Sequence, residues 1–412
     1  MATSNWRSRR FILFTIVVLL CGMIGTGSVF AKTKLTVGTW LAPESFLQQY
    51  GEMAVFMEQN PDIELEVINI AAHGEYAAKI LVLAATGSIP DVLMVPPEQV
   101  APIVNAGILE NLQPWMDNDG TLDTREWLPG AMSAMQFNDI TFGMPAFVVN
   151  YTYAYNPDIL NERGIVPPAA DSWVTWNQIR DIGRRSSVDV DGDGEMEVWG
   201  FFHGHTYTEL LPLLFQAGGF IFDDDMLLNL DQPAMYEGVN WLLDLIDAKI
   251  HGGSRADFYQ SRVATMRLGS FEMTNIFNNQ TPVAVTSGIQ YKTKGEVSYV
   301  TSYTMTKQSQ SKDAAWRYLK FLTSREAQQF VVERSRVPMR RDVRMPDTSR
   351  TMLTGLINSL GTAMGYPYHV ESNYIQSAVN SGMARVWTRE VTPAAAIPEI
   401  QRTVNAYLLD NR

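Results

Sequence analysis

The order of apolar patterns in the first hundred residues constrains the fold most. Residues 34–40 and 63–70 alternate apolar and polar side chains as strands do, and residues 91–95 form a short apolar run closed by two prolines. Between these segments, residues 45–60 and 75–85 repeat apolar side chains at helical spacing. A strand–helix–strand–helix–strand order predicts a parallel sheet with helices on its faces, so the expected fold class is α/β.

The rest of the chain continues the mixture of strands and helices. At 412 residues it exceeds one ordinary core, and no repeat or linker divides it, so two or three domains must be joined through ordered segments. Ser324 and Asp231 are candidate N-caps of two of the later helices. Strands are expected at residues 263–268, 283–286 and 299–306, and helices at 173–184, 210–217, 232–249, 314–322 and 326–332, with three more helical pieces from residue 352 onward.

Residues 1–31 have the composition of a secretory signal peptide. Three arginines precede the apolar run 11–20, and Val29 and Ala31 occupy the positions that a signal peptidase reads, so we expect cleavage after Ala31. A retained membrane anchor is disfavoured, because glycines interrupt the run before it reaches spanning length. Lipid attachment at Cys21 is a third alternative, disfavoured because Leu20 stands where a lipoprotein signal has a small residue.

Cleavage would leave a chain without cysteine, because Cys21 is the only one. Such a chain has no disulfide and no thiolate metal site. The net charge of −12 would become −15, with 29 basic and 44 acidic side chains, because the segment contains three arginines and no acid. An exported protein this acidic is not expected to bind nucleic acid.

Residues 143–155 predict a strand with an aromatic face. Phe147, Val149, Tyr151, Tyr153 and Tyr155 fall on one side at a spacing of two, while smaller side chains occupy the other. Such a face is either packed in a core or exposed as a stacking surface, and the alternation does not decide between them.

Three stretches together resemble the extracellular solute-binding proteins of ABC importers, the family that includes maltose-binding and other sugar-binding receptors. They follow one another in the family's order and cover most of the chain after residue 31. The stretches are residues 89–94 (Ile-Pro-Asp-Val-Leu-Met) with 106–109 and Leu112; 143–145 (Gly-Met-Pro) with 155–160, Gly164 and Trp173; and 314–324 with 337–340 (Val-Pro-Met-Arg).

The resemblance implies a periplasmic-binding-protein-like fold, in which two α/β lobes are joined by a multi-strand hinge with a ligand cleft between them. The implied division gives residues 32–148 and 287–325 to lobe 1, and residues 149–286 and 326–412 to lobe 2. The chain would cross between lobes at residues 143–155, 281–288 and 323–340. The sequence departs from the family at Ser261 and at Thr301-Ser302, which leaves the ligand class open.

A sugar receptor needs planar aromatic rings for stacking and polar groups for hydroxyl pairs. Side chains of these types at strand ends and in loops are therefore the candidate ligand contacts. They are Trp40, Glu44, Tyr76, Glu98, Phe147, Tyr151, His203, Phe220, Phe271, Glu272, Tyr303 and Arg340.

Residues 189–195 (Asp-Val-Asp-Gly-Asp-Gly-Glu) have the spacing of a calcium-binding loop. Asp189, Asp191 and Asp193 would supply oxygens, with Glu195 and Glu197 as further ligands. The acid expected at the twelfth position is missing, so an ordinary solvated turn is the alternative reading. A bound ion would be structural, and no other cofactor is expected.

The sequence lacks the nucleophile elbow, the phosphate-binding loops and the zinc motif of common enzymes. We therefore expect no enzyme, but a monomeric extracytoplasmic receptor that captures a mono- or oligosaccharide and delivers it to the transmembrane subunits of an ABC permease. A receptor for a non-sugar polar solute and an exported glycosidase are the two alternatives, the second because paired carboxylates cannot be recognised from sequence.

Overall fold

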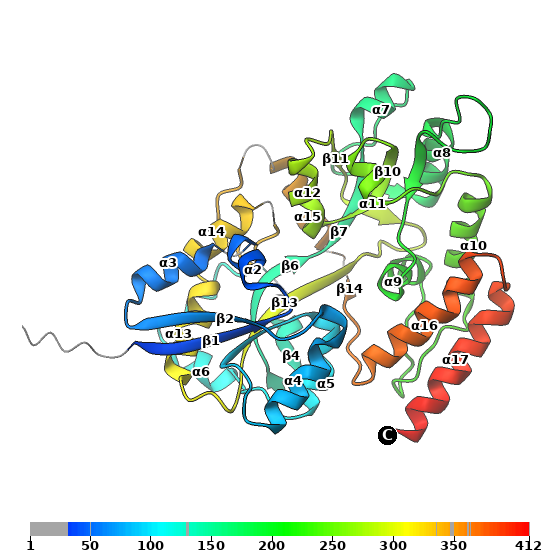
Figure 1. Cartoon of the computed structure of the whole chain (residues 1–412). Helices are drawn as coiled ribbons and strands as arrows, with labels where there is room; N and C mark the ends of the chain where they lie inside the picture. Colours follow the sequence, from blue (N-terminus) through cyan, green and yellow to red (C-terminus); the bar gives the residue numbers. More distant parts are fainter. Residues whose placement is uncertain are drawn as a thin grey trace, which may run out of the picture.

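The computed structural model describes residues 32–49, 51–128, 132–334, 336–346, 350–360, 362 and 364–411. Two sheets, each surrounded by helices, form two lobes (Figure 1). The expected signal peptide and Cys21 lie outside the described residues. Within the described ranges, no helix has both the length and the apolar character that a membrane crossing requires.

The first lobe contains the parallel sheet that the opening pattern predicted. β1 pairs with β2 in parallel from Thr33 opposite Ile63 to Thr39 opposite Asn69, and β3 lies parallel on its other side. β13 runs antiparallel to both β3 and β6. The strands are β1 (Thr33–Thr39), β2 (Ile63–Asn69), β3 (Val92–Val95), β6 (Met144–Val149), β13 (Val297–Met305) and β14 (Met364–Gly365).

Helices of the first lobe bury their apolar stripes against this sheet. Phe56 lies 5.0 Å from Tyr318 and 5.4 Å from Phe321 between ring centroids, which joins an early helix to a late one. Burial of rings of this size contributes about 1.5–3 kcal/mol each to stability. The helices are α2 (Pro43–Gln49), α3 (Glu52–Gln59), α4 (Tyr76–Ala85), α5 (Val100–Asn105), α6 (Gln113–Asn118), α13 (Lys312–Leu322) and α14 (Arg325–Glu333).

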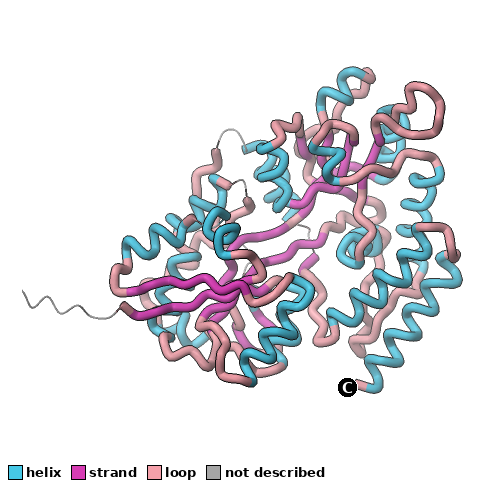
Figure 2. Tube along the Cα trace, viewed as in Figure 1, coloured by secondary structure: helices cyan, strands magenta, loops and turns pink. Residues whose placement is uncertain are grey.

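The second lobe is built on a separate sheet, drawn in magenta in Figure 2, whose strand order is β11-β7-β10-β9. Its strands are β7 (Tyr151–Tyr155), β9 (Trp199–Phe202), β10 (Val263–Gly269) and β11 (Ala284–Val285), with the separate pair β8 (Trp173–Thr175) and β12 (Gly288–Gln290). Its helices are α7 (Pro157–Glu162), α8 (Trp176–Ser186), α9 (Tyr207–Gln216), α10 (Pro233–Asp247), α11 (Arg255–Tyr259), α12 (Met273–Asn278), α15 (Arg350–Leu360), α16 (Ser372–Trp387) and α17 (Pro393–Asp410).

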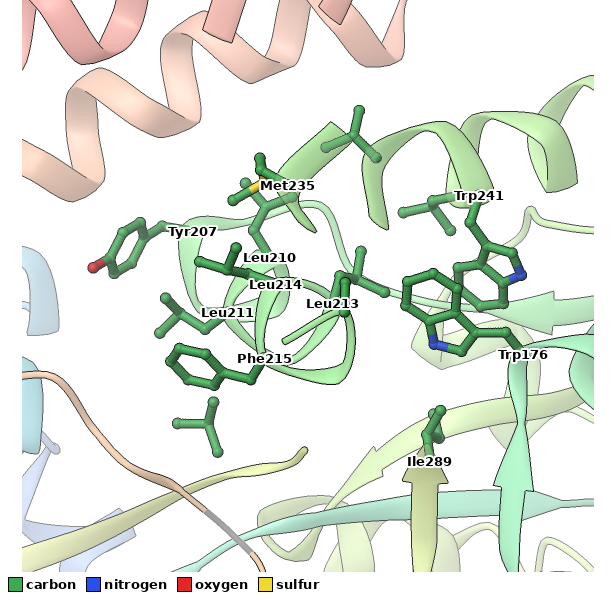
Figure 3. Close-up of a cluster of buried hydrophobic side chains, with 14 of the residues drawn as sticks. Trp176, Tyr207, Leu210, Leu211, Leu213, Leu214, Phe215, Met235, Trp241 and Ile289 are labelled. Carbon is green, nitrogen blue, oxygen red and sulfur yellow. The ribbon is translucent and has the colours of Figure 1, made fainter. Parts of the chain in front are cut away.

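The core of the second lobe gathers around α9 and α10, with Trp176 and Ile289 among its side chains (Figure 3). Trp176 stacks on Trp241 with ring centroids 4.7 Å apart and donates from Nε1 to Gln216 Oε1 at 2.6 Å. Its polar edge is therefore satisfied inside an apolar cluster. Thr175 and Gln178 form a capping box that starts α8.

The aromatic strand expected at residues 143–155 is divided by Asn150. β6 before it belongs to the first sheet and β7 after it to the second, so the chain changes lobes at this residue. Asn150 is fully buried, and its side-chain nitrogen donates to Ser359 Oγ at 2.5 Å and to the carbonyl oxygen of Leu356. These contacts with α15 satisfy the side-chain NH2 group at the point where the strand leaves its sheet.

Other boundaries differ from the expected ones. β12 pairs with β8, so residues 288–290 lie in the second lobe, and the second crossing is β13 itself. α14 stays with the first lobe, because Ala327 belongs to the same buried cluster as Phe56 and Gln328 Nε2 donates to the carbonyl oxygen of Ala146 at 2.7 Å.

The two expected helix caps have different outcomes. Ser324 caps α14 as expected, because its hydroxyl accepts from the amide of Ala327. The residue before α10 is Gln232 rather than Asp231, and Asp231 instead accepts from the Tyr236 hydroxyl at 2.7 Å.

Candidate ligand-binding site

A cavity of about 550 Å³, the interlobe cavity, lies between the two lobes. The first lobe with β6 and Thr301 supplies one part of its wall. The second lobe supplies the other, together with Tyr299 of β13, whose ring belongs to the second-lobe core. The lining residues are Trp40, Leu41, Pro96, Pro97, Glu98, Phe147, Val149, Tyr151, Thr206, Thr208, Phe271, Tyr299, Thr301, Arg336, Gln376 and Asn380.

Strand ends place the first-lobe residues. Trp40 follows β1, and Glu98 lies in a 3₁₀ turn, η2 (Pro97–Gln99), after β3. The carboxyl ends of neighbouring parallel strands meet at one edge of a sheet, which is where ligands bind in many α/β proteins. The two side chains are therefore brought to the same rim of the cavity by the register of the sheet.

Trp40 is supported from behind by apolar packing. Its ring meets the Tyr76 ring edge-on with centroids 5.7 Å apart. Tyr76 is fully buried and donates its hydroxyl to the carbonyl oxygen of Gly38 at 2.9 Å, which fixes the supporting ring. Trp40 is thus half-buried on a rigid base, with the rest of its surface available at the cavity.

The second-lobe wall presents a group of three aromatic rings. Tyr151 meets Tyr299 at 5.9 Å and Phe271 at 6.0 Å between centroids, both close to edge-on. Phe271 is 44% exposed and lies in η4 (Ser270–Glu272) after β10. A Cβ at Gly269 would lie 2.3 Å from Phe271 Cε1, so the ring position requires glycine there.

Polar side chains complete the wall. Thr206 and Thr208 at the start of α9 are joined by a hydroxyl contact of 3.0 Å. Asn380 Oδ1 accepts from the amide of Tyr207 at 2.6 Å, and its NH2 group has no acceptor among the described residues. Gln376 Nε2 donates to the Tyr366 hydroxyl at 3.1 Å. The amides and hydroxyls are held in place and can exchange hydrogen bonds with a polar ligand.

Two charged side chains line the cavity. The guanidinium carbon of Arg336 lies 4.8 Å from the centroid of Phe147. Burial raises the pKa of the Tyr366 hydroxyl, and the negative charge of nearby Glu98 adds to this rise. The tyrosine hydroxyls near Glu98 therefore remain protonated and can act as hydrogen-bond donors.

Five of the twelve expected ligand contacts line the interlobe cavity: Trp40, Glu98, Phe147, Tyr151 and Phe271. They come from both lobes and meet only in the folded chain. The structure places these side chains at the cavity, and their contact with a ligand stays a prediction.

Three expected contacts are buried in the lobes instead. Tyr76 supports Trp40, and Tyr303 packs against Tyr318 at 6.0 Å in the first-lobe core. His203 is 2% exposed, and its backbone amide donates to His251 Nε2 at 3.2 Å. Burial, opposed by nearby Glu209, lowers the pKa of His203 to about 3, so the ring is neutral and structural.

Two more expected contacts are held by opposite charges. Glu272 is fully buried and accepts from Arg255 Nε. Arg340 is bound in bidentate fashion by Asp342, at 2.8 and 2.9 Å, and also donates to the carbonyl oxygen of Asp123. Neither side chain lines the interlobe cavity.

The last two expected contacts are on the surface. Glu44 is exposed in the first turn of α2, and Phe220 is 62% exposed after a glycine pair. Neither lines the interlobe cavity.

Several lining residues were not expected from the sequence. Tyr299 and Thr301 lie in the predicted strand 299–306, of which only Tyr303 was an expected ligand contact. Gln376 and Asn380 lie one turn apart on α16, a spacing typical of any helix face. Arg336 follows α14, which was expected in the other lobe. No local pattern distinguishes these residues from ordinary surface or core positions.

The acidic loop is brought together as its spacing suggested. Oxygens of Asp189, Asp191 and Asp193 all lie within 4.8 Å of one another. Glu197 Oε2 accepts from the amide of Val190 at 2.7 Å, and Glu195 is exposed. The loop is separate from the interlobe cavity and none of its residues lines it.

Solved structures with the same arrangement of lobes are bacterial binding proteins. The ABC substrate-binding protein Lmo0181 from Listeria monocytogenes, in complex with cycloalternan, matches with a TM-score of 0.80 and 21% identity over 92% of this chain and 99% of its own. The GacH receptor of Streptomyces glaucescens, described with acarbose, matches with a TM-score of 0.75 and 21% identity over 90% and 97%. The MalE domain from Bdellovibrio bacteriovorus, bound to maltotriose, matches with a TM-score of 0.74 and 18% identity over 91% and 100%.

These similarities confirm the expected two-lobe α/β fold. A comparison with curated protein sequences gave no match. The family model described as bacterial extracellular solute-binding protein matches residues 38–329, which is well over half of the chain. The resemblance found in the sequence is confirmed, and this chain belongs to the family of bacterial extracellular solute-binding proteins.

Proposed function

We propose that this chain captures a carbohydrate in the interlobe cavity and delivers it to an ABC permease. The observation that supports this most directly is the composition of the cavity wall. Aromatic rings from both lobes, Trp40 on one side and the group of Tyr151, Phe271 and Tyr299 on the other, surround a space bordered by amides and hydroxyls. Rings of this kind cover the apolar faces of a pyranose, and the amides bind its hydroxyls.

The structural relatives agree with this ligand class, since Lmo0181, GacH and the Bdellovibrio MalE domain were solved with cycloalternan, acarbose and maltotriose. A cavity of about 550 Å³ is in the range of typical small-molecule sites. We expect the lobes to close around the sugar by a hinge motion at Asn150 and β13, the segments that join them. The closed monomer would be the form that the permease recognises.

The cavity does not favour a glycosidase. Hydrolysis of a glycosidic bond by the usual mechanism needs two carboxyl groups on either side of the bond. Glu98 is the one carboxylic acid among the described residues that line the interlobe cavity. A binding role without chemistry is therefore the better proposal, and a non-sugar polar solute remains the second candidate ligand.

We also propose that this chain is exported from the cytoplasm. The composition of residues 1–31 supports cleavage after Ala31 and release of the mature protein outside the cytoplasm, where a receptor of this family would meet its solute and permease. We also propose a structural calcium at the loop 189–195. Its carboxylate oxygens lie within 4.8 Å of one another, a separation that one ion with ligands at about 2.5 Å can span.

A thermal-shift panel tests the carbohydrate proposal. A ligand that binds only the folded state raises the melting temperature with concentration. We expect at least one of maltose, maltotriose, acarbose and D-tagatose to raise it, and the bound sugar to be recovered unchanged. A shift from amino acids, peptides or polyamines with none from sugars would favour the non-sugar receptor, and release of reducing ends over time would favour a glycosidase.

A further inference from the structure

Four buried charged side chains and the partly exposed Arg255 form an ion cluster behind the second-lobe wall. The buried members are Arg267, Glu209, Glu272 and Glu296. Arg267 is fully buried, donates from Nε to Glu296 Oε2 at 2.9 Å and donates from Nη1 to Glu209 Oε2. Arg255 donates from Nη2 to Glu209 Oε1 at 2.7 Å and from Nε to Glu272. Desolvation of so many charges offsets most of their attraction, so stability alone is a weak reason for such a cluster.

Each acid of the ion cluster is close in sequence to a residue that lines the interlobe cavity. The acids come from α9, from η4 and from the segment leading into β13, which are three separate parts of the second-lobe wall. A guanidinium that binds two of them therefore sets the distance between wall segments. The neighbours are Thr208 before Glu209, Phe271 before Glu272, and Tyr299 three residues after Glu296.

Arg267 also contacts the wall directly. Its guanidinium carbon lies 3.5 Å from the ring centroid of Tyr151, a distance at which a cation is attracted to the face of the ring. Tyr151 is 6% exposed and lines the cavity. Because the planar guanidinium covers one face, only the other face or the edge of the ring is left for a ligand, and the plane of the ring is fixed.

We infer that Arg267 is a positioning residue for ligand binding. Without touching the ligand, it orients the ring of Tyr151 and holds the wall segments that contain Glu209 and Glu296 at a fixed separation. The inference rests on the proposed function, because it concerns a ligand in the interlobe cavity. It requires the planar, two-sided guanidinium, since a lysine ammonium neither binds two carboxylates in a fork nor stacks on a ring.

The test is the dissociation constant of Arg267→Lys, measured by calorimetry at 10 °C after the melting curve shows the variant to be folded. The probe is the member of the panel of maltose, maltotriose, acarbose and D-tagatose that most raises the melting temperature of the wild type. We expect the dissociation constant to rise about tenfold. A merely structural role would lower the melting temperature but would not change affinity in a fully folded sample.

Arg340→Lys is the matched control. Arg340 is a buried arginine in a bidentate ion pair, but it belongs to the first lobe and does not line the cavity. The dissociation constant of Arg340→Lys for the panel sugar should stay within about twofold of the wild-type value. An equal rise in both variants, or no rise in Arg267→Lys, overturns the inference.

Glu296→Gln is the second variant, used if Arg267→Lys does not fold. It removes one charge partner of Arg267 while keeping the shape of the side chain, and it should also weaken sugar binding; unchanged affinity overturns the inference. A wild type that binds no panel member overturns the proposed function and this inference with it. A wild type that binds while Arg267→Lys binds equally well overturns the inference alone.

Discussion

The two walls of the interlobe cavity hold their aromatic rings by different physical means. On the first lobe, Trp40 rests on the buried ring of Tyr76, which is fixed by one neutral hydrogen bond to the backbone. On the second lobe, Tyr151 rests on the guanidinium of Arg267, which is fixed by buried carboxylates.

The difference decides how each wall responds to change. Apolar packing is non-directional and contributes stability in proportion to buried area, so a neutral ring tolerates small changes in its surroundings. A buried ion cluster contributes little net stability, but it is directional, and loss of one member leaves its partners unpaired. We therefore expect the second wall to be sensitive to charge and pH, and the first wall to be sensitive mainly to loss of ring area.

The largest expected effect comes from breaking the ion cluster. Arg267→Met leaves Glu209 and Glu296 buried without their shared partner and should lower the free energy of unfolding by about 3–5 kcal/mol. On the other wall, Tyr76→Phe removes only a hydroxyl and should cost about 1 kcal/mol. Urea denaturation measures both. Equal costs would show that the two walls are not supported in different ways.

Trp40→Ala tests the first wall through binding. Loss of the stacking ring should weaken the affinity for the panel sugar by about 2–3 kcal/mol, or roughly 30- to 150-fold. Stability should fall by only about 1 kcal/mol, since the side chain is half-buried. Trp115→Ala is the matched control, because Trp115 is a half-buried first-lobe tryptophan that packs against Trp316 at 5.9 Å, outside the cavity. If Trp115→Ala weakens binding as much, Trp40 is not a specific platform.

A pH titration tests the second wall. Burial raises the pKa of Glu272 from 4.5 to about 7, against the opposing effect of Arg255. Because the folded state holds this proton more tightly than the unfolded chain, the stability from Glu272 is complete below pH 4.5 and is lost as the pH rises to about 7. The amide in Glu272→Gln does not titrate. The unfolding free energy of this variant, relative to that of the wild type, should therefore rise by about 2 kcal/mol over that range.

The measurement is urea unfolding of both proteins at intervals from pH 4.5 to 7.5. Other groups titrate in both proteins and cancel in the difference, including His203, whose pKa burial lowers to about 3. A difference that stays constant with pH would mean that Glu272 does not change its charge in this range and that the second wall is no more sensitive to pH than the first.

The sequence predicts the first sheet better than the connection between lobes. Alternation and helical spacing in residues 34–95 are local, and they predict the parallel pairing that β1 makes with β2 and β3. The change of sheet at Asn150 depends on Ser359, which lies 209 residues later. A polar amide inside an aromatic run is a signal in retrospect, but its partner cannot be located from the run itself.

The candidate site was also only partly predictable, because local patterns do not show which distant segments meet. Trp40 and Glu98 were predictable as cavity residues because the ends of parallel strands meet at one edge. Gln376 and Asn380 reach the cavity only because α16 packs beside it. Glu272 could not be recognised as buried, since a carboxylate after an aromatic residue has the same sequence whether it meets a sugar or an arginine.

Phe271→Ala sharpens the comparison within the second wall. Phe271 belongs to the same wall as Tyr151 but is 44% exposed, so its loss should hardly change the free energy of unfolding. We expect the affinity for the panel sugar to fall by about 1 kcal/mol, or roughly fivefold. Calorimetry at 10 °C measures it, with Phe220→Ala as a control, because Phe220 is an exposed phenylalanine outside the cavity. An unchanged affinity would remove Phe271 from the proposed ligand contacts.

The smallest effect is expected at the loop 189–195, where carboxylates cluster in solvent rather than in the interior. Calcium at a concentration equal to its dissociation constant should raise the free energy of unfolding by only about 0.4 kcal/mol, since the gain follows the logarithm of saturation. The rise should be absent in Asp191→Asn and should be reversed by a chelator, while sugar affinity stays the same because the loop does not line the cavity. A melting curve with no response to calcium up to 10 mM would identify the loop as a solvated turn. A sugar affinity that depends on calcium would show that the loop is not separate from the second wall. The contrast with the ion cluster is one of burial. Carboxylates contribute little where solvent screens them, but they are decisive in the interior, where Arg255 and Arg267 are their salt-bridge partners.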